Sequence, residues 1–260
     1  MAGKRTLASS VRALAPFWGG LTCDAVRGST CRAYAAQAGV LDSTTRRRLS
    51  VLQSALNYAL AEGKLIYAPK VTLTDSGIPR DRFLTRDEAA RLLRAAPPHL
   101  RRFILIALAT GTRHKAILGL RWTQSLNSGW VDLERGIIHR KGARERETKK
   151  RRGDVAIPRG LLDHLRRWAR AGGSHVVMER GKPCGTIRRS FATACERAGL
   201  TDLHPHDLKR TAVTWAFQRG MTIEDAVSWF DTSAVTLQAV YRAHHPDHQA
   251  RAKAIMERRT

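Results

Sequence analysis

The stretch HPHDLKRTAVTW, residues 204–215, says more about the fold and the function of this chain than any other. Two histidines, an aspartate, a lysine and an arginine lie within seven positions, from His204 to Arg210. The residues that follow have the apolar spacing of a helix, and we expect Asp207 to cap it. Cationic side chains at the start of a helix suit the oxygens of a phosphate group. The stretch therefore predicts one half of a phosphate site.

The charge of the chain favours a polyanionic partner. Its 260 residues include 46 lysines and arginines against 22 acidic residues, a net charge of +24. Between Glu134 and Arg152, nine basic residues face three glutamates. A field of this sign and size attracts nucleic acid. A solvated basic surface without a partner is the weaker explanation, because the excess is large and partly concentrated.

The cysteines and the apolar segments predict a protein of the cytoplasm. No CxxC pair or His/Cys metal spacing occurs among the four cysteines, so we expect reduced thiols and no metal site. The most apolar stretch, FILIALA at residues 103–109, is far shorter than the ~20 residues that a bilayer span requires. We therefore expect no membrane segment.

The first third of the chain predicts a small helical unit. The segment STTRRRLSVLQSALNYALAE, residues 43–62, has apolar residues at helical spacing behind Ser/Thr caps. Residues 68–83 hold two prolines and a glycine without periodicity, which indicates a linker. Thr85 and Glu88 then form a capping box that opens a new helix. We expect a boundary at about residues 70–82, between domains at 1–75 and 83–260.

The larger unit is predicted to be mainly α with one small antiparallel β-sheet. Strand-like segments occur at residues 130–133, 137–140 and 155–157, in a basic region that indicates a hairpin. Helices are expected at 98–110, 114–121, 159–170, 186–198, 207–219, 222–230 and 234–243. The chain shows no internal repeat.

Four separate segments carry groups suited to attack by a tyrosine on a phosphodiester. A glycine break delivers Arg113 to the start of a helix, and Lys149 and Lys150 lie in the basic hairpin. His206 and Lys209 open the quoted stretch, and Tyr241 lies near the end of the last amphipathic helix. Arginine suits the non-bridging oxygens, whereas lysine and histidine suit proton transfer.

Each of these residues alone has a simpler explanation. Arg113 would more often be a solvated arginine at a helix start, and the two lysines part of a charge run. His206 fits a helix-capping turn, and Tyr241 fits a half-buried anchor of the last helix against Leu237. The four segments gain weight from their combination.

In this order, the segments resemble those of the tyrosine recombinase (phage integrase) family. The resemblance rests on LQSALNYALAEGKL, APKVTL, FLTRDEAARLL, ALATGTRHKAILGLRW, HDLKRTAVTW and VYRAHHPDHQ. It implies a helical core-binding domain and a catalytic domain that clamp duplex DNA. It assigns the first catalytic arginine to Arg113, the strand lysine to Lys149 or Lys150, the histidine to His206 and the nucleophile to Tyr241.

The resemblance also implies partners and a setting. We expect double-stranded DNA as the partner, no cofactor, and self-association on DNA, as a tetramer if the protein is active. A bacterial or phage-encoded protein associated with the nucleoid is implied. Further contacts with DNA are expected from eight basic side chains: Arg46, Arg47, Arg48, Arg140, Lys141, Arg151, Arg152 and Arg210.

Three departures leave two hypotheses open. Lys209 stands where the family has its second arginine, Ala116 where an acidic residue is usual, and Asp231-Thr232 where Gly-His is expected. Losing one well-placed charge-stabilising donor slows a reaction by about 100- to 1,000-fold. The chain is therefore either a site-specific recombinase that works through a 3′-phosphotyrosyl intermediate or an impaired relative kept for binding DNA, with a regulatory or architectural role.

Overall fold

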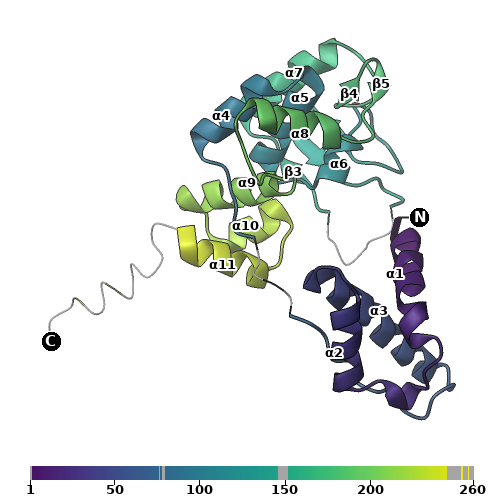
Figure 1. Cartoon of the computed structure of the whole chain (residues 1–260). Helices are drawn as coiled ribbons and strands as arrows, with labels where there is room; N and C mark the ends of the chain where they lie inside the picture. The colour runs from purple at the N-terminus through teal and green to yellow at the C-terminus, as the bar shows by residue number, and fades with distance from the viewer. Residues whose placement is uncertain are drawn as a thin grey trace. The chain divides into compact units, whose positions relative to one another are not determined.

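The computed structural model describes residues 2–75, 77, 80–145, 152–244, 253 and 257, with only the backbone at 2–4 and 241–244. The chain divides into two compact units, Met1–Arg80 and Asp81–Thr260 (Figure 1). Helices predominate and the strands are short and antiparallel, so the predicted fold class is confirmed. No helix in the described ranges is long and apolar enough to cross a bilayer.

The first unit consists of three helices and a short 3-10 turn, Cys23–Ala25. The helix predicted at 43–62 is α3 (Asp42–Ala61), whereas α1 (Ala2–Trp18) and α2 (Gly28–Gln37) were not predicted. Aromatic rings join α1 to α2, with the ring centres of Phe17 and Tyr34 5.4 Å apart. The core of the unit consists of Leu14, Trp18, Val26, Cys31, Tyr34, Leu49, Leu56 and Val71.

The chain that follows α3 returns along that helix. The side-chain oxygen of Gln53 accepts from the backbone N–H of Val71 at 2.7 Å, and its amide nitrogen donates to the carbonyl of Pro69 at 3.3 Å. The hydroxyl of Thr74 donates to the carbonyl of Asp42 at 2.9 Å. The first part of the segment expected to be a linker is therefore held against α3.

The second unit begins at the predicted capping box. The hydroxyl of Thr85 accepts from the backbone N–H of Glu88 at 3.2 Å, and the Glu88 carboxylate accepts from that of Thr85 at 2.9 Å. This box opens α4 (Arg86–Ala95). The other helices are α5 (Pro98–Thr110), α6 (His114–Leu118), α7 (Arg159–Arg170), α8 (Arg188–Arg197), α9 (Asp207–Gln218), α10 (Ile223–Phe230) and α11 (Ala234–His244).

The strands form two small sheets. The first has the order β1 (Trp130–Asp132), β2 (Ile137–His139) and β3 (Val155–Ala156), all antiparallel. Ile138 pairs with Val131 on one side and with Val155 on the other. A separate hairpin, not predicted, joins β4 (Met178–Glu179) to β5 (Lys182–Pro183).

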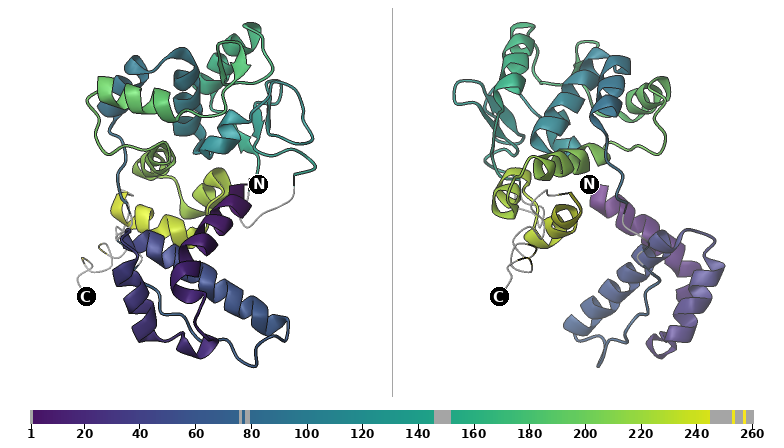
Figure 2. Two further views of the ribbon diagram at one scale, coloured as in Figure 1. Left: turned by 45° about the vertical axis from the view of Figure 1, so that its right-hand side comes forward. Right: turned by 90° about the vertical axis from the view of Figure 1, so that its left-hand side faces the viewer.

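Helix α9 lies between the body of the second unit and its C-terminal helices. In Figure 2 it runs between α4, α5 and α8 on one side and α10 and α11 on the other. Two side chains of α9 bind the segment with which the second unit begins. Thr211 accepts from the backbone N–H of Leu84 at 2.9 Å, and Trp215 donates to the Leu84 carbonyl at 2.9 Å. Phe103 of α5 and Leu208 of α9 are fully buried. Both belong to one hydrophobic core, so α9 packs against α5.

The prediction that Asp207 caps α9 is wrong. His206 holds the N-cap position without a side-chain cap, and Asp207 is the first residue inside the helix. The carboxylate of Asp207 instead accepts from the backbone N–H of His204 at 2.8 Å. It therefore stabilises the turn that leads into the helix.

Candidate active site

The turn that leads from α5 to Arg113 depends on a glycine at the end of α5. Gly111 adopts the left-handed conformation, with φ of 60°. A Cβ there would lie 2.4 Å from Cδ1 of Phe230, so any side chain would collide with the end of α10. The chain then turns, and Arg113 holds the N-cap of α6 in an extended conformation.

Three cationic side chains meet the carbonyl groups at the C-terminal end of α10. Arg140 donates to the carbonyl of Trp229 at 2.7 Å, and Lys209 donates to that of Phe230 at 2.7 Å. Arg113 donates to the carbonyl of Asp231 at 3.4 Å. These carbonyls have no partner within the helix and form the negative end of its dipole. The helix end therefore gathers three positive charges that would otherwise repel one another.

The three cations line a small pocket, which we call the cation pocket. It is formed by Gly111, Thr112, Arg113, Ala116, Arg140, Arg152, Lys209, Phe230 and Asp231. Lys209 is half-buried in the wall of this pocket. Loss of solvent, followed by repulsion from Arg113 and Arg140, lowers the pKa of Lys209 to about 7. Such a perturbed lysine, beside two arginines in a pocket, is typical of a site that binds an anion.

His206 is the N-cap residue of α9, three residues before Lys209. Its side chain is exposed, yet partial loss of solvent and then the charge of Lys209 lower its pKa from 6.5. It is therefore mainly neutral at neutral pH. A neutral imidazole can accept a proton.

Asp231 and Thr232, at the positions that depart from the family pattern, hold the end of α10. Asp231 is left-handed, with φ of 53°, and its carboxylate accepts from the backbone N–H of Gly153 at 2.8 Å. The hydroxyl of Thr232 donates to the carbonyl of Phe230 at 3.1 Å. No acidic group comes from Ala116, and Asp231 is the carboxylate whose charge raises the pKa of Lys209. The carboxylate that lines the cation pocket thus comes from the C-cap of α10 and not from α6.

The comparisons with known proteins identify the family. Residues 82–248 match the phage integrase family. The chain belongs to this family. It is 27% identical over 233 residues to the integrase of Salmonella phage P22, covering 80% of this chain and 57% of that protein. It is 28% identical over 192 residues to a shufflon-specific DNA recombinase of Escherichia coli, covering 70% and 45%. The chain thus spans about half the length of these relatives.

Solved structures of integrases share the fold. The Tn1549 transposon integrase in complex with circular intermediate DNA has a TM-score of 0.72 and 17% identity, covering 92% of this chain and 88% of that one. A lambda integrase dimer bound to a COC′ core site has a TM-score of 0.68 and 17% identity, covering 93% and 71%. The likeness extends over both units of the chain.

The remaining catalytic positions of the phage integrase pattern are only partly described. Lys149, Lys150 and Arg151 lie outside the described residues. Tyr241 lies in α11, four residues after the buried Leu237, and its backbone alone is described.

Arg140, predicted to contact DNA, lies inside the second unit of this phage integrase relative. Its side chain is 3% exposed. Nε donates to the hydroxyl of Thr112 at 3.0 Å, and Nη2 donates to the carbonyl of Thr110 at 2.8 Å as well as to Trp229. The guanidinium of Arg140 is therefore not part of the exposed basic surface. The sequence did contain a signal for this burial. Side chains two positions apart along a strand point to the same face, and Arg140 follows the buried Ile138 by two positions.

The other predicted DNA contacts are more accessible. In the first unit, Arg47 is exposed, Arg48 is half-buried, and Arg46 is half-buried and donates to the carbonyl of Thr74. In the second unit, Lys141, Arg152 and Arg210 are half-buried. Arg152 pairs with Glu145 at 3.1 Å and also lines the cation pocket.

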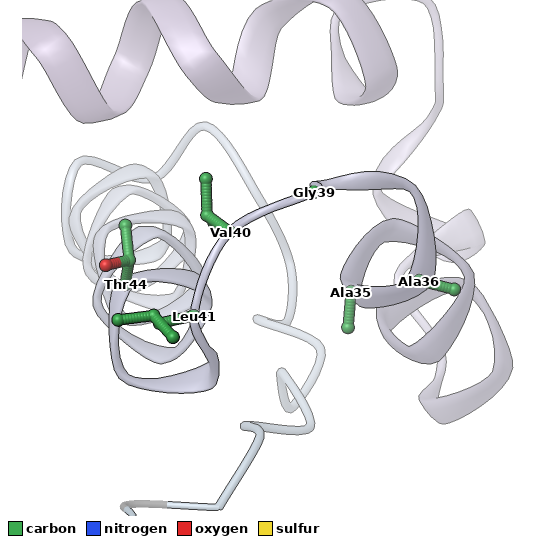
Figure 3. A pocket seen from close by; sticks show the side chains of 6 residues that line it. All are labelled: Ala35, Ala36, Gly39, Val40, Leu41 and Thr44. Atoms are coloured by element: carbon green, nitrogen blue, oxygen red, sulfur yellow. The ribbon is translucent and has the colours of Figure 1, made fainter.

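Three other places in the described part of the chain have features of a site. A hollow between α2 and α3 is lined by Ala35, Ala36, Gly39, Val40, Leu41 and Thr44, none of them charged (Figure 3). A larger groove between α4, α5, α9 and α10 is mainly apolar, with Trp215 and Trp229 in its wall. Possible metal-ligand atoms of three residues lie within 4.8 Å of one another: His99, Glu179 and Cys184. The sequence did not predict this group because its members are far apart along the chain. Among these places and the cation pocket, the cation pocket alone combines four cationic side chains with positions of the family pattern.

Proposed function

We propose that the protein is a site-specific recombinase that cleaves and rejoins double-stranded DNA through a 3′-phosphotyrosyl intermediate. The observation that carries the proposal is the cation pocket, in a chain of the phage integrase family. Arg113 and Lys209 come from distant segments and line the same pocket. Converging cations of this kind stabilise the charge that develops on a phosphate in the transition state.

The proposed reaction exchanges one phosphodiester for another. The phenol oxygen of Tyr241 bonds to phosphorus, and the bond from phosphorus to the 5′ oxygen breaks. His206, neutral because of its lowered pKa, accepts the phenol proton. Lys149 or Lys150 protonates the departing 5′ oxygen, while Arg113 and Lys209 hold the non-bridging oxygens. The phosphotyrosyl bond retains the energy of the original bond, so rejoining by a 5′ hydroxyl needs no cofactor.

The proposal also includes the DNA contacts, the self-association and the location of the protein. Arg46, Arg47, Arg48, Lys141, Arg151, Arg152 and Arg210 contact the DNA backbone. The lambda integrase has been solved as a tetramer bound to a Holliday junction, which supports self-association on DNA here. The protein acts in the cytoplasm of a bacterium, on chromosomal or phage DNA.

A second candidate is a DNA-binding relative in which cleavage has been lost. The observation in its favour is Lys209, which has no guanidinium fork and has its amine occupied by the carbonyl of Phe230. Ala116 and Thr232 add to it. Such a protein would still bind DNA through its arginines and lysines.

A covalent-capture experiment separates the two candidates. Duplexes of random sequence with a nick near their centre are incubated with the protein, since the nick lets the cleaved end diffuse away and traps the adduct. Material that stays joined to protein in detergent is sequenced, with Tyr241→Phe as the control. We expect adducts that depend on Tyr241 and that converge on a common sequence.

The opposite result would favour the second candidate. Tight, salt-sensitive binding to the same duplexes, with no more adduct than Tyr241→Phe gives at any pH, would show that the protein binds DNA without cleaving it. Sequences recovered by adduct formation also provide the substrate for the experiments below.

A further inference from the structure

The cation pocket contains a guanidinium group that the family pattern does not place there. Position 209 holds a lysine, whose single amine contacts an oxygen as a point charge and cannot grip two oxygens at once. Arg140, at the end of β2, lines the same pocket as Lys209 and Arg113. With Arg152, which also lines the pocket but pairs with Glu145, the pocket has three guanidinium groups, and that of Arg140 comes from the end of β2.

The donors of Arg140 are used unequally. Nε and Nη2 donate three hydrogen bonds, to the hydroxyl of Thr112 and to the carbonyls of Thr110 and Trp229. Nη1 is buried and has no hydrogen-bond partner in the described part of the chain. An arginine can donate five hydrogens, so two remain unused. Buried donors without an acceptor are rare and costly, and they call for an explanation.

The electrostatics of the pocket point to an anion as the missing acceptor. The pKa of Arg140 is lowered to about 10, chiefly by loss of solvent; the charge of Asp231 raises it, that of Arg113 lowers it and that of Asp154 raises it. Both carboxylates are engaged elsewhere, Asp231 with the N–H of Gly153 and Asp154 with His139 at 2.9 Å. An anion in the pocket would relieve this excess of positive charge.

The three hydrogen bonds also fix the guanidinium before any ligand arrives. They attach it to the ends of α5 and α10, so little side-chain entropy remains to be lost on binding. We propose that Arg140, through Nη1, supplies the second guanidinium contact to the scissile phosphate in place of an arginine at position 209. This inference rests on the proposed function, because it takes the cation pocket as the place of the phosphate.

The first experiment needs no substitution in the protein that is titrated. Arginine side-chain N–H signals are followed by nuclear magnetic resonance while inorganic phosphate is added, and the spectrum of Arg140→Lys identifies the signal of Arg140. We expect the signals of Arg140 and Arg113 to shift together with one dissociation constant. A shift at Arg113 with none at Arg140, or no shift at either, would overturn the proposal.

The second experiment measures cleavage. Arg140→Lys keeps the charge but has no Nη1, and we expect its rate of adduct formation on the selected duplex to fall by about 100- to 1,000-fold. The exposed Arg135 of the same hairpin gives the matched control, because Arg135→Lys should leave the rate unchanged. Equal rates in Arg140→Lys and the unsubstituted protein would overturn the proposal.

A structural role for Arg140 predicts a different pattern. Thermal unfolding of Arg140→Lys is therefore measured with and without phosphate. If Arg140 only crosslinks α5 and α10, phosphate raises the melting temperatures of the substituted and unsubstituted proteins equally, and this would count against the proposal. If phosphate engages Arg140 but no DNA forms an adduct, the strand-cleavage proposal fails and the phosphate contact of Arg140 stands.

Discussion

The arginines of α3 and the cations of the cation pocket represent two ways of carrying positive charge. Arg47 is exposed on α3, where water solvates its charge in any conformation. Arg140 is 3% exposed and depends on the carbonyls of Thr110 and Trp229. An exposed charge such as that of Arg47 needs no particular partner. The buried charge of Arg140 is stable only because the ends of α5 and α10 supply hydrogen-bond acceptors.

This difference separates affinity from geometry. An exposed arginine attracts the DNA backbone from a distance and gains from it mainly by releasing counterions. A buried arginine cannot reach for a ligand, but it holds its donors in one direction. The comparison therefore predicts that substitutions in the cation pocket affect folding and pH dependence, whereas substitutions on α3 affect the response to salt.

The largest effect, on the free energy of unfolding, is expected from Gly111→Ala, which adds a side chain to the lining of the cation pocket. The new Cβ would lie 2.4 Å from Cδ1 of Phe230, at a φ of 60° that side chains rarely adopt. Strain and overpacking together should lower the free energy of unfolding by about 2 to 4 kcal/mol. Chemical denaturation followed by circular dichroism measures the loss.

Gly136→Ala is the matched control for Gly111→Ala. Gly136 has a similar φ of 66°, but a Cβ there would lie 3.9 Å from Leu162, in ordinary contact. It should therefore cost about 1 kcal/mol, the backbone share alone. Equal losses in the two variants would contradict the close packing of α5 against the end of α10.

The sequence predicted the two halves of the cation pocket but not what joins them. Arg113 and Lys209 follow from local signals, a glycine break and a helix start, and helices begin and end near these signals. The meeting point is the C-terminal end of α10, whose carbonyls carry no sequence signature. Backbone acceptors are present in every residue, so their use depends on tertiary structure.

The burial of Arg140 was not predicted because its local context is dominated by charge. In the run from Glu134 to Arg152, a basic residue is easily assigned to a solvated face. Arg140 directly follows β2, two residues after the buried Ile138, and strand alternation predicts that it faces the same, buried side as Ile138. Likewise, α1 and α2 were missed although Trp18 and Tyr34 pack together with ring centres 5.9 Å apart, since this contact links separate helices.

An intermediate effect is expected from pH, through Lys209. Its pKa of about 7 in the free protein means that the amine is charged below pH 7 and mainly neutral above it. A bound phosphate favours the charged form, so binding above pH 7 takes up a proton and weakens as pH rises. We expect affinity for the selected duplex to fall by up to about tenfold per pH unit above 7.

Lys209→Arg provides the control, because arginine stays charged throughout this range. Affinity is measured by fluorescence anisotropy in buffers without phosphate, which would compete for the pocket. His206 titrates below 6.5 and adds little to the change above pH 7. A pH dependence that persists unchanged in Lys209→Arg would show that the amine does not meet the phosphate.

The smallest effect is expected on α3, where Arg47→Ala removes an exposed charge. Because Arg47 lies free of the core, the free energy of unfolding should change by less than about 0.5 kcal/mol. If Arg47 contacts one phosphate, the slope of the logarithm of the binding constant against that of salt concentration should become shallower by about 0.9. Arg47→Lys should restore the slope, since counterion release depends on charge and not on the fork. Arg46 is unsuited to this measurement because it also donates to Thr74. A loss of affinity in Arg47→Ala with an unchanged slope would mean that this arginine contacts a base or protein. Arg47 would then not be an example of an exposed charge that acts through counterion release.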